Sequence, residues 1–112
     1  MLKIIKNPEF KALVKVMVPT DRGQVEHSFT ARFRALTRSE EAQYDALNAA
    51  STDDFLRRVV VGWEGLQDEN GEVLEFSDEA LNTLIDLHYI RMGIVQAYTS
   101  MISGVKAARR GN

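Results

Sequence analysis

Residues 11–34 read KALVKVMVPTDRGQVEHSFTARFR and carry the clearest strand pattern of the chain. Apolar residues alternate with polar ones on both sides of the turn-forming segment 19–23, which ends in Gly23. Two such segments around a short turn predict a β-hairpin with one buried face. The residues expected on that face are Ala12, Val14, Val16, Val18, Val25, His27, Phe29, Ala31 and Phe33. Because a lone hairpin is marginally stable in water, we expect it to pack on helices or to pair with another chain.

The segment after the hairpin changes to helical spacing and predicts two helices. Thr37 and Glu40 have the arrangement of a capping box, so the first helix should start there and fade near Asn48. Residues 51–54, Ser-Thr-Asp-Asp, offer an N-cap and well-placed acids for the second helix. The apolar positions expected on this second helix are Phe55, Leu56, Val59, Val60 and Trp63.

Two further helices are predicted after the glycine-containing break at residues 65–71. Ser77, followed by two acids, should cap the third helix, whose apolar positions are Leu81, Leu84 and Ile85. The last helix should be the longest, since basic residues and Gly111 favour an end near residue 110. Its apolar face is expected to contain Ile90, Ile94, Ala97, Tyr98, Met101, Ile102 and Val105.

The predicted fold class is therefore α+β, with an N-terminal β-hairpin (11–34) packed on a bundle of about four helices (37–110). The chain is 45% hydrophobic and 27% charged, which is typical of one globular domain spanning residues 1–112. It has no cysteine, so neither a disulfide nor a thiolate metal site is expected. No signal peptide or membrane-spanning segment is predicted, because no apolar run approaches about 20 residues.

Residues that could perform catalysis or bind a metal are few, and no familiar catalytic motif occurs. His27 and His88 lie far apart in the sequence, without cysteine or HExxH partners, so we interpret both as structural histidines. The acidic segment 68–72 lacks the ligand spacing of a calcium loop and predicts a turn. The sequence thus predicts no enzyme activity, no metal and no cofactor.

Basic residues form two groups, which leave nucleic-acid binding open as an alternative. The groups are Arg32, Arg34 and Arg38, and Lys106, Arg109 and Arg110. A structural role is favoured for both, because the first group lies on the polar face of a strand and the second near the negative end of a helix. The net charge of −2 also argues against a general affinity for nucleic acid.

Several short motifs follow one another in a distinctive order along the chain. Val-Gly-Trp-Glu-Gly at residues 61–65 is followed by an acidic loop and by Phe-Ser-x-Glu-x-Leu at residues 76–81. The other segments are Asn7-Pro8-x-Phe10, Val14-x-Val16-x-Val18-Pro19, Asp53-Asp54-Phe55-Leu56, Ala97-Tyr98 and Gly111-Asn112. This order resembles that of the tail assembly chaperones of long-tailed bacteriophages and their prophages, most specifically at residues 61–81, and the resemblance covers most of the chain.

The resemblance implies a non-catalytic function in the cytoplasm of a bacterial host. Proteins of this family bind the tape measure protein, promote assembly of the tail tube around it, and are absent from the mature virion. Many also have a longer form made by a programmed ribosomal frameshift. The implied partners are therefore the tape measure protein and, through such a form, the tail tube protein. The alternatives are a structural tail or connector protein retained in the virion, and a small DNA-binding regulator.

A tape measure protein is long and helical, so its partner needs an adaptable apolar surface. Methionine packs flexibly against varied surfaces, and the last helix carries two methionines. The residues predicted to bind the partner are Tyr98, Met101, Met92, Ile94, Val105 and Trp63. Unpaired strand edges of the hairpin make self-association a further expectation, whereas no membrane partner is expected.

Overall fold

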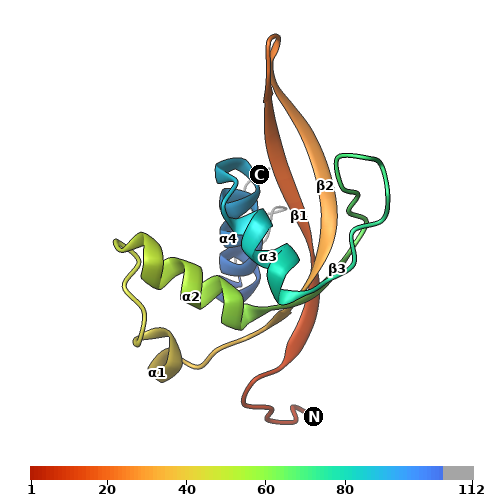
Figure 1. Cartoon of the computed structure of the whole chain (residues 1–112). Helices are drawn as coiled ribbons and strands as arrows, with labels where there is room; N and C mark the ends of the chain where they lie inside the picture. Colours follow the sequence, from red (N-terminus) through yellow and green to blue (C-terminus); the bar gives the residue numbers. More distant parts are fainter. Residues whose placement is uncertain (105–112) are drawn as a thin grey trace, which may run out of the picture.

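The computed structural model describes residues 1–104 and confirms the predicted α+β class. A three-stranded antiparallel sheet in the order β1-β2-β3 carries the helices on one side (Figure 1). The strands are β1 (Glu9–Thr20), β2 (Gly23–Arg34) and β3 (Val60–Glu64). The helices are α1 (Arg38–Glu41), α2 (Ala49–Val59), α3 (Asp78–Ile85) and α4 (His88–Ser103).

The predicted hairpin is confirmed and is longer than expected, because β1 and β2 pair along their whole length up to a turn at residues 21–22. Gly23 follows this turn with a positive φ of 102°, a conformation that is costly for other residues. The tip of the hairpin projects beyond the helices (Figure 1). His27 lies on the predicted inner face, opposite the buried Val16, yet its side chain is exposed. The prediction that His27 packs in the interior is therefore wrong.

Helix α1 starts as predicted and ends much earlier. The capping box is present, since the backbone N–H of Glu40 donates to Thr37 Oγ1 at 3.2 Å and the N–H of Thr37 donates to Glu40 Oε1 at 2.9 Å. The chain leaves the helix after Glu41, and the Asp45 carboxylate then accepts a bond from the backbone N–H of Leu47 at 2.9 Å. Such local side-chain bonds favour a turn over a helix.

The prediction that the second helix continues through Trp63 is wrong. Helix α2 begins after the N-cap Asn48, and residues 60–64 form strand β3 instead. The three consecutive valines at 59–61 favour extended chain, because β-branched side chains pack well in sheets. Strand β3 also gives hydrogen-bond partners to the outer edge of β2, where Ala31 lies opposite Trp63.

The core lies between the sheet and the helices and includes a cluster of aromatic rings. Tyr98 packs against Phe10, Phe33 and Phe55 with ring centroids 6.2, 5.6 and 5.3 Å away. Its hydroxyl accepts a hydrogen bond from the backbone N–H of Leu36 at 3.0 Å, which satisfies a buried donor. The remaining buried core residues are Val14, Val16, Phe29, Ala31, Leu56, Val59, Val60, Leu81, Leu84, Ile85, Ile90 and Ile94.

Helix α4 also ends earlier than predicted, since Gly104 closes it at a positive φ of 72°. Ile90 and Ile94 are buried as expected, whereas Ile102 is exposed. Apolar residues repeated every four positions drift about 40° around a helix at each step, so the face turns away from the core. The predicted helical residues from Val105 onward, including Lys106, Arg109 and Arg110, lie outside the described residues.

Candidate functional site

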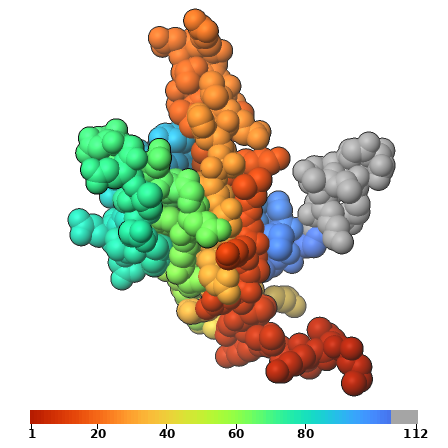
Figure 2. Space-filling view, turned by 90° about the vertical axis from the view of Figure 1, so that its right-hand side faces the viewer, coloured from red at the N-terminus to blue at the C-terminus, as the bar shows by residue number. Residues whose placement is uncertain are grey.

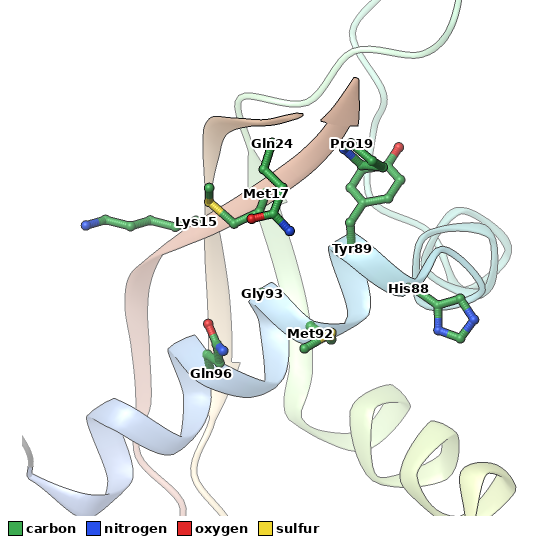
Figure 3. A pocket seen from close by; sticks show the side chains of 9 residues that line it. All are labelled: Lys15, Met17, Pro19, Gln24, His88, Tyr89, Met92, Gly93 and Gln96. Carbon is green, nitrogen blue, oxygen red and sulfur yellow. The ribbon is translucent and has the colours of Figure 1, made fainter. Parts of the chain in front are cut away.

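An apolar groove lies between the edge strand β1 and helix α4 (Figure 3). Its volume of about 280 Å³ is near the lower end for ligand pockets, and it is open to solvent. The hairpin forms one wall and the first half of α4 forms the other. The lining residues are Lys15, Met17, Pro19, Gln24, His88, Tyr89, Met92, Gly93 and Gln96. We refer to this surface as the hairpin–α4 groove.

Gly93 allows α4 to approach β1 closely at the floor of the groove. A Cβ atom at this position would lie 2.5 Å from the carbonyl oxygen of Lys15 and 3.0 Å from Cγ1 of Val16. No larger residue therefore fits without a shift of the strand or the helix, because protein interiors are close-packed. The close approach also lets α4 cover part of the open edge of β1, which protects that edge from pairing with other strands.

Two methionines stand on the two walls of the groove (Figure 3). Met17 on β1 is 40% exposed and Met92 on α4 is 60% exposed. Pro19 of β1 and Tyr89 of α4 also line the groove (Figure 3). Thioether side chains are flexible and polarisable, so walls of this kind pack against apolar partners of different shapes. The groove is thus a candidate binding site for apolar side chains of another protein.

The polar groups of the groove are basic or neutral. Lys15 forms no ion pair with any side chain in residues 1–104, and His88 provides the other basic group. Gln24 and Gln96 add amide groups at the rim. An apolar floor with a few polar groups around it is suited to orienting a bound segment.

The predicted basic group at the end of β2 does not form an open cationic surface. Arg32 and Arg34 both pair with Glu9, at 3.0 and 3.5 Å. The hydrogen bond from Arg32 and the nearby positive charges lower the pKa of Glu9 from its usual value of 4.5. Because this carboxylate partly neutralises the two arginines, they offer less attraction for phosphates than the sequence alone implies.

Three of the predicted partner-binding residues belong to the interior. Ile94 and Tyr98 are buried in the core. Trp63 is half-buried, and its Nε1–H donates to the carbonyl oxygen of Leu74 at 2.8 Å. Burial leaves Ile94 and Tyr98 no surface for a partner in this conformation, because apolar side chains of this size are held by the surrounding packing.

The exposed members of the predicted set are not brought together either. Met92 lines the hairpin–α4 groove, whereas Met101 lies nine residues later on the same helix. At about 100° per residue, the two methionines point to opposite sides of α4. Val105 lies outside residues 1–104.

Of the groove residues, the sequence predicted only Met92. The large apolar residues that it missed are Met17, Pro19 and Tyr89, and the others are Lys15, Gln24, His88, Gly93 and Gln96. Met17 occupies a position where the alternation of β1 calls for a polar side chain. An apolar residue on the solvent side of an edge strand is the signal that could have indicated a second contact surface. The closeness of Tyr89 to the strand is a tertiary feature with no counterpart in local sequence.

Within residues 1–104 no group of three or more His, Cys, Asp or Glu side chains could hold a metal ion. A second, more polar hollow of about 700 Å³ lies among α2, α3 and α4. Its arginines, Arg57 and Arg91, are occupied by ion pairs with Asp54 and Asp53.

None of the helices within residues 1–104 is long and apolar enough to cross a membrane. Comparisons with protein-family models, curated proteins and solved structures found no match for this chain. The resemblance to tail assembly chaperones therefore rests on the sequence motifs quoted above.

Proposed function

We propose that this protein is a non-catalytic tail assembly chaperone of a long-tailed bacteriophage or prophage, and that it binds the tape measure protein through the hairpin–α4 groove. The observation that carries the proposal is an exposed apolar groove with a methionine on each wall, Met17 and Met92. The ordered motifs, above all Val-Gly-Trp-Glu-Gly at residues 61–65, support the choice of family.

The groove suits one face of an amphipathic helix. A tape measure protein is expected to be long and helical, so its apolar side chains recur every three to four residues along one side. A volume of about 280 Å³ holds a few side chains rather than a whole helix. Each copy of the protein would therefore cover a short stretch of its partner, and many copies would cover its apolar length.

The motif that resembles the family most closely has a structural role in this chain. Trp63 of β3 packs edge-on against Phe76 at 4.9 Å between ring centroids. Ser77 then caps α3, because its hydroxyl accepts a bond from the backbone N–H of Ala80 at 3.0 Å. These contacts fix the connection between β3 and α3, so the partner-binding side chains are expected elsewhere, in the groove.

In this proposal the protein acts in the cytoplasm of the bacterial host and leaves before the virion is complete. A longer form made by a ribosomal frameshift would bring the tail tube protein to the tape measure protein.

The proposal is tested by purifying the tagged protein from cells that are assembling phage and comparing the eluate with purified virions by mass spectrometry. Recovery of a very long helical protein in the eluate, together with absence from virions, supports the chaperone function. Stoichiometric presence in virions would make the protein a structural tail component and overturn the proposal.

A pair of variants tests the groove separately. Met92→Asp should abolish recovery of the tape measure protein, because a charge in the groove disfavours apolar contacts. Met101→Asp is the matched control, since Met101 is 52% exposed and lies on the other side of α4. Thermal unfolding establishes that both variants are folded. Equal binding by the two variants would exclude the groove as the site.

A further inference from the structure

The segment before β1 is an apolar arm that stands apart from the core. Residues 1–6 read MLKIIK and have no helix or strand structure. Figure 2 shows this arm, in red, extending away from the body of the protein. Its large apolar side chains, each more than half exposed, are Met1, Leu2, Ile4 and Ile5. Because a contiguous apolar patch is unfavourable in water, its exposure indicates contact with another molecule.

The base of the arm is fixed to the segment that follows β2 and to helix α1. The side-chain amide of Asn7 donates to the carbonyl oxygen of Ala35 at 2.9 Å and to Glu40 Oε1 at 2.8 Å. The carbonyl oxygen of Pro8 accepts a bond from the backbone N–H of Ala35 at 2.9 Å. The arm therefore leaves the body at a defined point, which reduces the entropy that it loses on binding.

The arm is basic as well as apolar, since its charged residues are Lys3 and Lys6 and residues 1–8 contain no acid. Neither lysine forms an ion pair with any side chain in residues 1–104. A partner surface for the arm should therefore combine carboxylates with an exposed apolar side chain.

The connection between β3 and α3 has that composition. Segment 68–75, which we call the acidic loop, carries Asp68, Glu69, Glu72 and Glu75 and no basic residue. All four side chains are exposed, and none forms an ion pair within the described part of the chain. Val73, between them, is 72% exposed.

The acidic loop has a defined conformation. The Asp68 carboxylate accepts bonds from the backbone N–H groups of Asn70 and Glu72 at 2.8 and 3.0 Å. An isolated antiparallel bridge joins Gln67 to Val73. The loop thus presents its carboxylates on a preorganised backbone, a feature that favours binding over a flexible loop of the same charge.

The arm and the acidic loop lie on different sides of the molecule, at the bottom and at the upper right of Figure 1 and again far apart in Figure 2. An arm of six residues extends at most about 20 Å, at about 3.4 Å per residue. The molecule measures 46 by 39 by 29 Å along its principal axes. The separation of the two segments in both views favours contact of the arm with the acidic loop of a neighbouring copy rather than with its own.

We propose that the arm of one copy binds the acidic loop of a second copy, head to tail. Lys3 and Lys6 pair with the loop carboxylates, and the apolar side chains of the arm cover Val73. A contact between two different surfaces leaves one arm and one loop free at the ends, so further copies can join in the same way. This inference concerns other surfaces than the hairpin–α4 groove and does not rest on the proposed function.

Sedimentation velocity over a range of protein and salt concentrations tests the contact. The protein should self-associate at low salt, and the association constant should fall at least tenfold near 1 M salt, where the Debye length is about 3 Å. Lys3→Glu/Lys6→Glu should weaken association at least tenfold. The control Arg22→Glu/Arg38→Glu has the same net charge and alters exposed residues outside the arm, the loop and the groove, so it should not weaken association.

Charge reversal on the other surface completes the test. Glu69→Lys/Glu72→Lys alone should also prevent association, because it cancels the net negative charge of the loop. A mixture of the arm variant and the loop variant should restore association, because the unaltered arm of the loop variant then meets the unaltered acidic loop of the arm variant. Circular dichroism should be unchanged, since these side chains do not contribute to the core. A monomeric wild-type protein at every concentration, equal loss in the control, or failure of the mixture to associate would overturn the proposal.

Discussion

Gly93 of α4 lies so close to Lys15 of β1 that a Cβ atom at position 93 would be 2.5 Å from the Lys15 carbonyl oxygen. Gly93→Ala is therefore expected to destabilise the protein by about 1–3 kcal/mol, the usual range for overpacking. This range is a net value, because the higher helix propensity of Ala offsets up to about 1 kcal/mol of the cost of overpacking. Urea unfolding measures the difference. Gly62→Ala is the control, since a Cβ there meets only the Cβ of Arg32, at 3.7 Å. An equal effect of the two substitutions would contradict the close approach of α4.

The Tyr98 hydroxyl is the acceptor for the backbone N–H of Leu36. Tyr98→Phe keeps the ring and leaves a buried donor unpaired, so it should cost about 1–3 kcal/mol of unfolding free energy. Tyr44→Phe should cost less, because the Tyr44 hydroxyl accepts from the side chain of Arg58 in a partly exposed position. Burial raises the pKa of Tyr98 above its usual value of 10.0. A Tyr98→Phe protein as stable as the wild type would mean that water reaches Leu36.

Glu40 gives the protein an acid-sensitive contact. Hydrogen bonds from the backbone of Thr37 and then from Asn7, with a smaller effect of Arg58, lower the pKa of Glu40 from 4.5 to about 2. A lowered folded-state pKa means that the ionised carboxylate stabilises the fold above pH 4.5 and that this stabilisation is lost as the pH falls towards about 2. Glu40→Gln should therefore lower stability at neutral pH and flatten its pH dependence between these values. Parallel stability curves for the two proteins would show that Glu40 contributes nothing.

Leu56 lies in α2, and Leu47 lies in the connection between α1 and α2. Leu56 is 0% exposed and Leu47 is 98% exposed. Leu56→Ala should destabilise by about 2–5 kcal/mol through lost packing. Leu47→Ala should change stability by no more than about 0.5 kcal/mol, since the side chain contacts mainly solvent. Comparable losses from both substitutions would favour the long first helix predicted from the sequence.

Secondary-structure features that depend on residues close together in the sequence could be predicted from the sequence. The alternation around Phe29 and Ala31 identified the buried hairpin face, and the Thr37–Glu40 capping box identified a helix start, because each depends on local spacing alone. The strand at residues 60–64 could not be predicted in this way. The valines of this segment are compatible with a helix or a strand. The segment forms a strand because the open edge of β2 offers it backbone hydrogen-bond partners. The groove could not be predicted either, because it forms only where Gly93 packs against β1, which is far away in the sequence.

The position of β2 between β1 and β3 has a consequence for the order of folding. β1 joins β2 through a tight turn, whereas β3 reaches β2 only after the chain has closed a loop that contains α1 and α2. Closing a long loop costs more entropy, so we expect the hairpin to assemble first and β3 to join later. Gly23→Ala should then mainly slow refolding, and Trp63→Leu should mainly speed unfolding, in stopped-flow experiments. The reverse assignment of the two rates would mean that the sheet assembles from β3.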